Sequence, residues 1–196
     1  MNYNPRDRFF LKAKKENFAA RSVYKLEEID KKYKIFRSKQ RVLDLGASPG
    51  SWSQFASQKI GKDGRILGVD LSPVTVKLEN AVFIQADLRD LNLKEIFAQH
   101  QMSESFDIVM SDMAPKTTGI RFTDQARSFE LCDLALNVAD EFLKPGGAFI
   151  CKLFHSDEFT TLRDRIKSSY QRFEAIKPES TRKISKEIFL IGLNKK

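Results

Sequence analysis

Short apolar runs alternate with segments of helical spacing along most of this chain. The apolar runs read RVLDLG, RILGVD, VFIQAD, FDIVMSD and GGAFICKLF, and two more, RFEAIKP and EIFLIGLN, follow them. Helical patterns follow four of the first five runs, at residues 51–60, 92–98, 124–143 and 157–170. This alternation predicts an α/β fold with a mostly parallel sheet, helices on both faces and two closing strands.

Apolar side chains recur at helical spacing in three segments, and they predict faces that pack against the sheet. The clearest stripe lies at 124–143 and is stopped by Pro145, Gly146 and Gly147. The stripes consist of Leu131, Leu134, Ala135, Val138 and Phe142, of Phe159, Leu162, Ile166 and Tyr170, and of Val23, Leu26, Ile29 and Tyr33. We assign all three to the core, and we expect 113–123 to be a mobile loop.

A length of 196 residues with 41% hydrophobic composition suits one well-buried core, so residues 1–196 predict a single domain. The two cysteines, Cys132 and Cys151, form no C-x-x-C motif, which argues against a metal site or a disulfide framework and is typical of a reducing cytoplasm. No apolar run approaches the length needed to span a bilayer. We expect a soluble, cytoplasmic protein without a metal or a membrane partner, and we expect a monomer.

The net charge of +8 is concentrated near the two ends of the chain. Residues 1–41 carry +8 and residues 177–196 carry +4, whereas residues 42–176 carry −4. Scattered lysines often do no more than keep a surface soluble, but segregation of this kind is typical of a partner rich in phosphate. We therefore predict that 1–41 is a basic segment that binds nucleic acid and contains one helix, and that 42–196 is the core of the fold.

Four aspartates, Asp44, Asp70, Asp87 and Asp112, fall at or near the carboxyl ends of the first four predicted strands. That edge of an open α/β sheet is where ligands bind. A pyrophosphate would meet several negative charges there, whereas a ligand with a sulfonium and an ammonium group would be attracted. S-adenosylmethionine has both groups, and it is the cofactor we predict. Helix caps and turn formers account equally well for one or two of the four aspartates.

The turn Gly46-Ala47-Ser48-Pro49-Gly50 also matches the G-x-S-x-G pattern of a hydrolase nucleophile elbow. An elbow needs an oxyanion loop before it, yet none of the preceding residues resembles H-G-G-G, and His155 is the only histidine that would complete the order Ser, Asp, His. We therefore interpret the turn as a cofactor loop in which Gly46, Ser48 and Gly50 let the backbone approach a ligand closely.

Lys152 is the unusual residue of GGAFICKLF, because a buried parallel strand normally excludes a lysine side chain. The side chain can extend from the end of the strand into water, which would leave it without a special role. A desolvated lysine beside other charges can instead act as a base near neutral pH.

Five segments, ARSVYKLEEID, VLDLGASPGSWSQ, SDMAPK, GGAFICKLF and KPESTRKISKEIFLI, occur in an order and spacing that are specific when taken together. In these the chain resembles the FtsJ/RrmJ (RlmE) family of S-adenosylmethionine-dependent RNA ribose 2′-O-methyltransferases, over nearly its whole length. The resemblance implies a Rossmann-like class I methyltransferase fold, with a seven-stranded, mostly parallel sheet whose last strand is antiparallel.

The resemblance also implies that 1–41 is an RNA-binding segment and 42–196 a cofactor-binding and catalytic core, and it implies the site. The catalytic tetrad of the family maps onto Lys25, Asp112, Lys152 and Glu187, with Lys152 as the general base, Lys25 as a second cation and the two acids orienting them. Its cofactor positions map onto Gly50, Trp52, Asp70, Asp87 and Asp112. Ser51 stands where the family frequently has glycine, and Phe189 where it frequently has tyrosine, so a hydroxyl near Glu187 is missing.

The implied activity is methyl transfer to a ribose 2′-hydroxyl, with a uridine of 23S rRNA in the large ribosomal subunit as the expected substrate. Alternative substrates are tRNA and cap ribose. A noncatalytic RNA-binding factor of ribosome assembly is an alternative from another class, and labelled methyl transfer would distinguish it from an enzyme.

Overall fold

Seven strands form one sheet in the computed structural model, which describes residues 7–182 and 184–196. Their order is β3-β2-β1-β4-β5-β7-β6. Strands β1 to β5 are parallel, and β7 is antiparallel to both β5 and β6. The strands are β1 (Arg41–Leu45), β2 (Arg65–Asp70), β3 (Ala81–Gln85), β4 (Phe106–Ser111), β5 (Leu143–Phe154), β6 (Tyr170–Ile176) and β7 (Glu187–Lys195). All seven predicted strands are confirmed.

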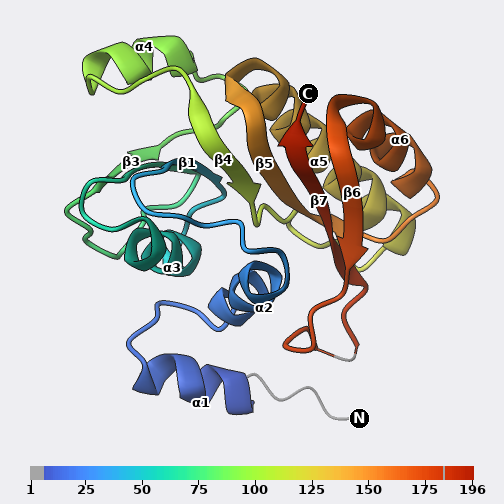
Figure 1. The fold of residues 1–196 in the computed structure, drawn as a ribbon. Coiled ribbons are helices and arrows are strands. Elements are labelled where there is room, and N and C mark those ends of the chain that lie inside the picture. Colours follow the sequence, from blue (N-terminus) through green and yellow to red (C-terminus); the bar gives the residue numbers. More distant parts are fainter. Residues whose placement is uncertain (1–6, 183) are drawn as a thin grey trace.

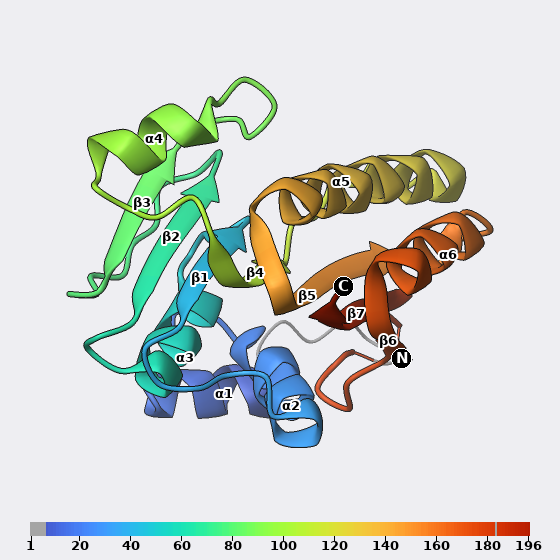
Figure 2. The same ribbon diagram turned by 45° about the horizontal axis from the view of Figure 1, so that its top comes forward.

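Helices cover both faces of the sheet, as predicted (Figures 1 and 2). On one face lie α1 (Arg8–Lys15), α2 (Val23–Tyr33) and α3 (Ser51–Ile60). On the other lie α4 (Leu93–Gln99), α5 (Arg121–Phe142) and α6 (Phe159–Ser169). None of the helices in the described ranges is long and apolar enough to cross a membrane.

Two hydrophobic cores result, because successive residues of a strand point to opposite faces. In β5, Phe149 and Cys151 pack under α5 and α6, whereas Ile150 packs toward α2 and α3. The same alternation in β4 sends Val109 to one core and Met110 to the other. Alternation therefore also decides which strand-end side chains face α2.

Helix α1 was not predicted from periodicity. Asp7 caps it by accepting hydrogen bonds from the backbone N–H groups of Phe9 and Phe10, and only Ala13 is buried in it. The helix does not pack on the sheet but on α2, where the rings of Phe9 and Tyr24 lie 5.6 Å apart. An apolar stripe this short is too weak a signal to be recognised in the sequence.

Two details of α5 differ from the prediction. The helix begins at Arg121, so the end of the segment expected to be a loop is helical. Its buried face includes Cys132, Leu136 and Ala139, while Leu131 and Leu134 are only half-buried. These two leucines line a cavity rather than the sheet.

Candidate active site

Three of the predicted tetrad residues lie on one face and at one edge of the sheet. In β4 and β5 the residues Ser111 and Cys151 are paired, so Asp112 and Lys152, the next residues along, also lie side by side. Glu187 begins β7, where Phe154 is its partner in β5. Because β7 runs antiparallel, its first residue rather than its last lies at the carboxyl edge of the parallel strands.

Lys152 is held by Asp112. Its Nζ donates to the Asp112 carboxylate oxygen Oδ1 at 2.8 Å and to the Asp112 backbone carbonyl at 2.5 Å. The Lys152 side chain is only 8% exposed, so it does not extend freely into water. A charge this far from solvent needs a partner, and Asp112 supplies it.

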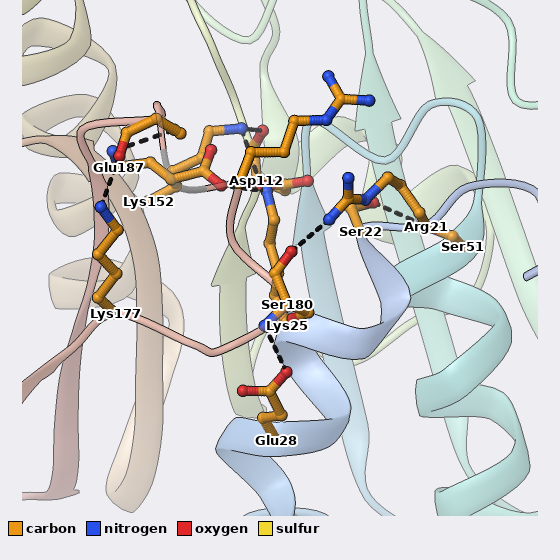
Figure 3. A network of polar contacts seen from close by, with 12 residues as sticks. Arg21, Ser22, Lys25, Glu28, Ser51, Asp112, Lys152, Lys177, Ser180 and Glu187 are labelled. Carbon is orange, nitrogen blue, oxygen red and sulfur yellow. Dashed lines mark hydrogen bonds and ion pairs between the residues drawn. The ribbon is translucent and has the colours of Figure 1, made fainter. Parts of the chain in front are cut away.

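Lys25 of α2 pairs with Glu187, at 2.5 Å between Nζ and Oε1. Both side chains are 12% exposed. The structure thus brings all four tetrad residues to the same edge as two ion pairs, and Figure 3 shows both pairs within one network of polar contacts.

Helix α2 is attached to the start of α3 close to these pairs. The Trp52 indole N–H donates to the Ser22 carbonyl at 3.0 Å, and the hydroxyls of Ser22 and Ser51 lie 3.0 Å apart. The Trp52 ring packs against Phe189 with centroids 5.7 Å apart. Ser51 therefore makes a contact that the glycine common in the family could not, and Phe189 fills an apolar position without a hydroxyl.

A cavity of about 320 Å³ opens beside Asp112 at the carboxyl ends of β1 to β4. Three predicted aspartates line it, namely Asp70, Asp87 and Asp112. Gly46 and Ser48 of the turn also line it, and its apolar lining includes Leu88, Met113, Leu131 and Leu134. An elongated ligand with a cationic or hydroxyl-bearing part and an apolar part would suit this lining.

Asp70 and Asp87 already accept hydrogen bonds within the chain. Asp70 accepts from the backbone N–H groups of Ser48 at 3.0 Å and Ser72 at 2.7 Å. Asp87 pairs with Arg89, which lines the same cavity, and these hydrogen bonds lower the pKa of Asp87. Each carboxylate has about four acceptor positions, so both can still accept from a ligand.

The two turn glycines are required by the backbone. Gly46 has a φ of +81°, and a Cβ there would approach the Met113 side chain to 2.7 Å. Gly50 has a φ of +117°, and a Cβ there would meet Val76 at 2.3 Å. Neither Gly50 nor Trp52 is among the residues found lining the cavity. Both lie at the start of α3, so their part in cofactor binding stays a prediction.

Asp44 does not line the cavity, unlike the other three strand-end aspartates. Because successive residues of β1 point to opposite faces of the sheet, the Asp44 side chain points toward α3. It is fully buried there and accepts a hydrogen bond from the Ser53 hydroxyl at 2.6 Å. Its other oxygen, Oδ1, has no hydrogen-bond partner within the described ranges. Burial, opposed by the Ser53 hydrogen bond and reinforced by Asp112 and Asp70, raises the pKa of Asp44 to about 7.

The nucleophile-elbow alternative is not supported by the geometry. The Ser48 hydroxyl donates to the Pro73 carbonyl at 3.2 Å. His155 instead stacks on Phe159 with centroids 5.4 Å apart, and its backbone N–H donates to the Lys186 carbonyl. Ser48 is a cavity-lining turn residue, as the cofactor-loop interpretation requires.

The basic N-terminal segment extends along α1 and α2 on the α2 face of the sheet (Figure 1). Arg8, Lys12, Lys14 and Lys15 are exposed on α1. Arg6, which belongs to the same predicted surface, lies outside the described residues. Arg21 differs from these in being half-buried, where it forms an ion pair with Asp7 and donates to the Ser180 carbonyl.

Comparison with known proteins identifies the family. Residues 18–195 match the FtsJ-like methyltransferases. A Bdellovibrio bacteriovorus protein named ribosomal RNA large subunit methyltransferase E is 72% identical over 196 residues, with both chains covered completely. A protein of the same name from Sorangium cellulosum is 47% identical over 195 residues, which are 99% of this chain and 90% of that one. The chain therefore belongs to the FtsJ-like methyltransferase family, which confirms the resemblance found in the sequence.

Solved structures agree with this assignment. A ribosomal RNA methyltransferase from Plasmodium falciparum has a TM-score of 0.76 at 28% identity, over 91% of this chain and 98% of that one. Fibrillarin from Aeropyrum pernix, solved with natively bound S-adenosyl-L-methionine, has a TM-score of 0.58 at 18% identity, over 80% of this chain and 67% of that one. The predicted Rossmann-like class I methyltransferase fold is confirmed.

The buried carboxyl of Asp44 predicts a pH-dependent stability. The pKa of Asp44 is about 7 in the folded chain and near 3.8 in the unfolded chain. The contribution of this carboxyl to the free energy of unfolding is therefore complete below pH 4 and is lost as the pH rises through 7. The loss amounts to roughly 4 kcal/mol. The Asp44→Asn variant should lack this pH-dependent loss, so its free energy of unfolding relative to that of wild type should increase between pH 4 and 8. Urea unfolding across that range measures this, and parallel curves for the two proteins would contradict it.

Proposed function

We propose that this enzyme transfers the methyl group of S-adenosylmethionine to a ribose 2′-hydroxyl of RNA. The observation that carries the proposal is the buried Lys152–Asp112 pair, whose Asp112 lines a cavity together with Asp70 and Asp87. It combines acceptors suited to a cationic cofactor with a lysine that can take up a proton. Membership of the FtsJ-like family supports it.

The residues of the cavity fit the cofactor. Asp70 and Asp87 offer acceptors for ribose hydroxyls and the adenine amino group, and Leu88, Leu131 and Leu134 offer an apolar surface for the base. The bound cofactor supplies an electrophilic methyl group on a sulfonium. Asp112 lines the cavity and also holds Lys152, so it connects the cofactor site with the base.

Lys152 is the general base of the proposed mechanism. A neutral lysine has two N–H bonds and one lone pair, and its two contacts with Asp112 use both N–H bonds. The lone pair is then available to the 2′-hydroxyl. Lys152 Nζ would accept the hydroxyl proton as the ribose oxygen takes up the methyl group that a bound cofactor would supply. The resulting ammonium is stabilised by the Asp112 carboxylate.

Lys25 and Glu187 complete the site. Lys25 places a second positive charge where negative charge develops on the ribose oxygen. Glu187 holds Lys25 and balances its charge at a site with little exposure to water. Holding both reactants in line accounts for much of the expected rate.

For the substrate we infer a uridine of 23S rRNA within the large ribosomal subunit. Two relatives are named for the large-subunit RNA, and the exposed cations of α1 suit a phosphate backbone. Incubation with large subunits that lack the modification, followed by mapping of the methylated ribose, tests this inference. If only tRNA or cap ribose is methylated, that RNA is the substrate in place of 23S rRNA. If no RNA is methylated, a noncatalytic assembly factor is favoured.

Lys152→Arg tests the base directly. Arginine keeps the charge but does not give up a proton near neutral pH. We expect single-turnover methyl transfer to fall by roughly 10² to 10⁴ fold while cofactor and RNA binding stay near wild type. Lys144→Arg, on the same strand but 41% exposed, is the matched control. Near wild-type transfer by the Lys152 variant would mean that Lys152 is an electrostatic clamp.

Asp70→Ala and Asp87→Ala should each weaken S-adenosylmethionine binding, by roughly five- to a hundredfold, because each removes acceptors at the cavity. Asp70→Asn separates this effect from loss of the turn, since an amide oxygen can still accept from Ser48 or Ser72. The exposed neighbour Asp90→Ala is the control. Calorimetry with the cofactor alone measures it, and unchanged affinity in both alanine variants would assign these aspartates to turn formation.

The α1 surface predicts the salt dependence of RNA binding. The logarithm of affinity should fall with the logarithm of salt by roughly 0.7 per phosphate contact on a single strand. Replacing Arg6, Arg8, Lys12, Lys14 and Lys15 by alanine should flatten that slope. Lys94→Ala with Lys167→Ala, on the opposite face of the sheet, should leave it unchanged. If the α1 variant keeps the wild-type slope, the RNA surface lies elsewhere.

A further inference from the structure

The loop between β6 and β7 leads directly into Glu187, the first residue of β7. Lys177 closes the base of the loop by donating from Nζ to the Ser185 carbonyl at 2.6 Å. Residues 179 and 180 of the loop lie beside α2 (Figure 3). Ser180, at its turn, is 1% exposed.

Glu28 holds this loop on α2. One of its carboxylate oxygens accepts from the backbone N–H of Glu179 at 2.6 Å, and the other accepts from that of Ser180 at 2.9 Å. Both hydrogen bonds are charge-assisted, which makes them stronger than those between neutral groups. On its other side, the carbonyl of Ser180 accepts from Arg21, so one peptide segment of the loop is bound from both directions.

Glu28 lies three residues after Lys25 and therefore on the same side of α2, one turn along. A single helix thus makes two contacts with the same loop-and-strand unit. Glu28 binds the loop through its backbone, and Lys25 binds Glu187 at the loop's end, at 2.5 Å. The distance between α2 and the start of β7 is therefore set at two points.

We propose that Glu28 is a positioning residue of the methyl-transfer site. By anchoring residues 179 and 180 to α2, it keeps Glu187 beside Lys25 and so keeps Lys25 directed at the reacting ribose. It touches neither cofactor nor substrate in this role. The inference rests on the proposed function, because that assigns the Lys25–Glu187 pair to the reaction.

A merely structural carboxylate at this position would produce a different result. Loss of a surface anchor would lower stability without changing the chemical step of the folded enzyme. Loss of a positioning contact changes the rate at saturating substrate, because displacement of a reacting group by about 1 Å can cost roughly a hundredfold. The rate of single turnover therefore separates the two roles.

The experiment compares Glu28→Ala, Glu28→Gln and Glu27→Gln in the full chain. Glu27 is the matched control, since it is the neighbouring acid of α2, has a 51% exposed side chain and has its ion pair 4.0 Å away at Lys12. With RNA and cofactor saturating, we expect Glu28→Ala to slow methyl transfer by roughly 10 to 100 fold with the KM for S-adenosylmethionine unchanged. Glutamine keeps an acceptor oxygen and should restore part of the rate, and the Glu27 variant should match wild type.

A double-mutant cycle with Glu187→Gln tests whether Glu28 acts through the ion pair. Residues that act as one unit give losses that do not add. We expect the second substitution to cost little once the first is present. Fully additive losses, or a Glu28→Ala variant with the wild-type rate, would overturn the proposal.

Amide hydrogen exchange tests the anchor independently of activity. The amides of Glu179 and Ser180 should exchange faster in Glu28→Ala than in wild type, and unchanged protection would also overturn the proposal. If the anchor is present and wild-type enzyme still fails to methylate any RNA, the proposed function fails while the structural contact stands. The two failures are therefore distinguishable.

Discussion

The Lys152–Asp112 ion pair is the interaction on which the arrangement of the site depends. A lysine with 8% of its side chain exposed is costly to bury unless a carboxylate accompanies it. That carboxylate is adjacent only because β4 and β5 are parallel neighbours in register, with Ser111 beside Cys151. The sheet order thus determines the chemistry of the site, because a different strand in the place of β4 would leave Lys152 without Asp112 as its partner.

Charge is divided between parts of the chain in a way that would suit both a cationic cofactor and RNA. Residues 42–176 carry −4 and line the acidic cavity, whereas residues 177–196 carry +4 and residues 1–41 carry +8 with exposed cations on α1. A cationic cofactor is attracted to the first and repelled by the second, and the reverse holds for RNA. This division of charge would guide each of the two proposed ligands toward its own part of the surface.

The strands and the two-faced core could be predicted from the sequence because both depend on local periodicity. Helix α1 could not, since its support is a single neighbouring helix and not the sheet. Leu131 and Leu134 have the spacing of core residues, and only the cavity beside them explains their partial exposure. Asp44 shares its strand-end position with the cavity aspartates, but alternation in β1 turns it under α3.

The tetrad could be predicted from the family resemblance but not from residue spacing, because Lys25 and Glu187 lie near opposite ends of the chain. Glu28 was not accessible at all. Its partners are the backbone N–H groups of Glu179 and Ser180. Because a backbone N–H group does not depend on the residue type, the sequence does not reveal this contact. Contacts between a side chain and a distant main chain are the part of a site that sequence patterns describe least.

The antiparallel course of β7 has a consequence for the order in which the two ion pairs can form. This strand enters between β5 and β6, and its first residue completes the ion pair with Lys25 of α2. Helix α2 is synthesised early and β7 late, so Lys25 has no Glu187 to pair with until the last strand of the sheet is present. Of the two ion pairs, Lys25–Glu187 is thus the one that can form only after the last strand of the sheet has been synthesised.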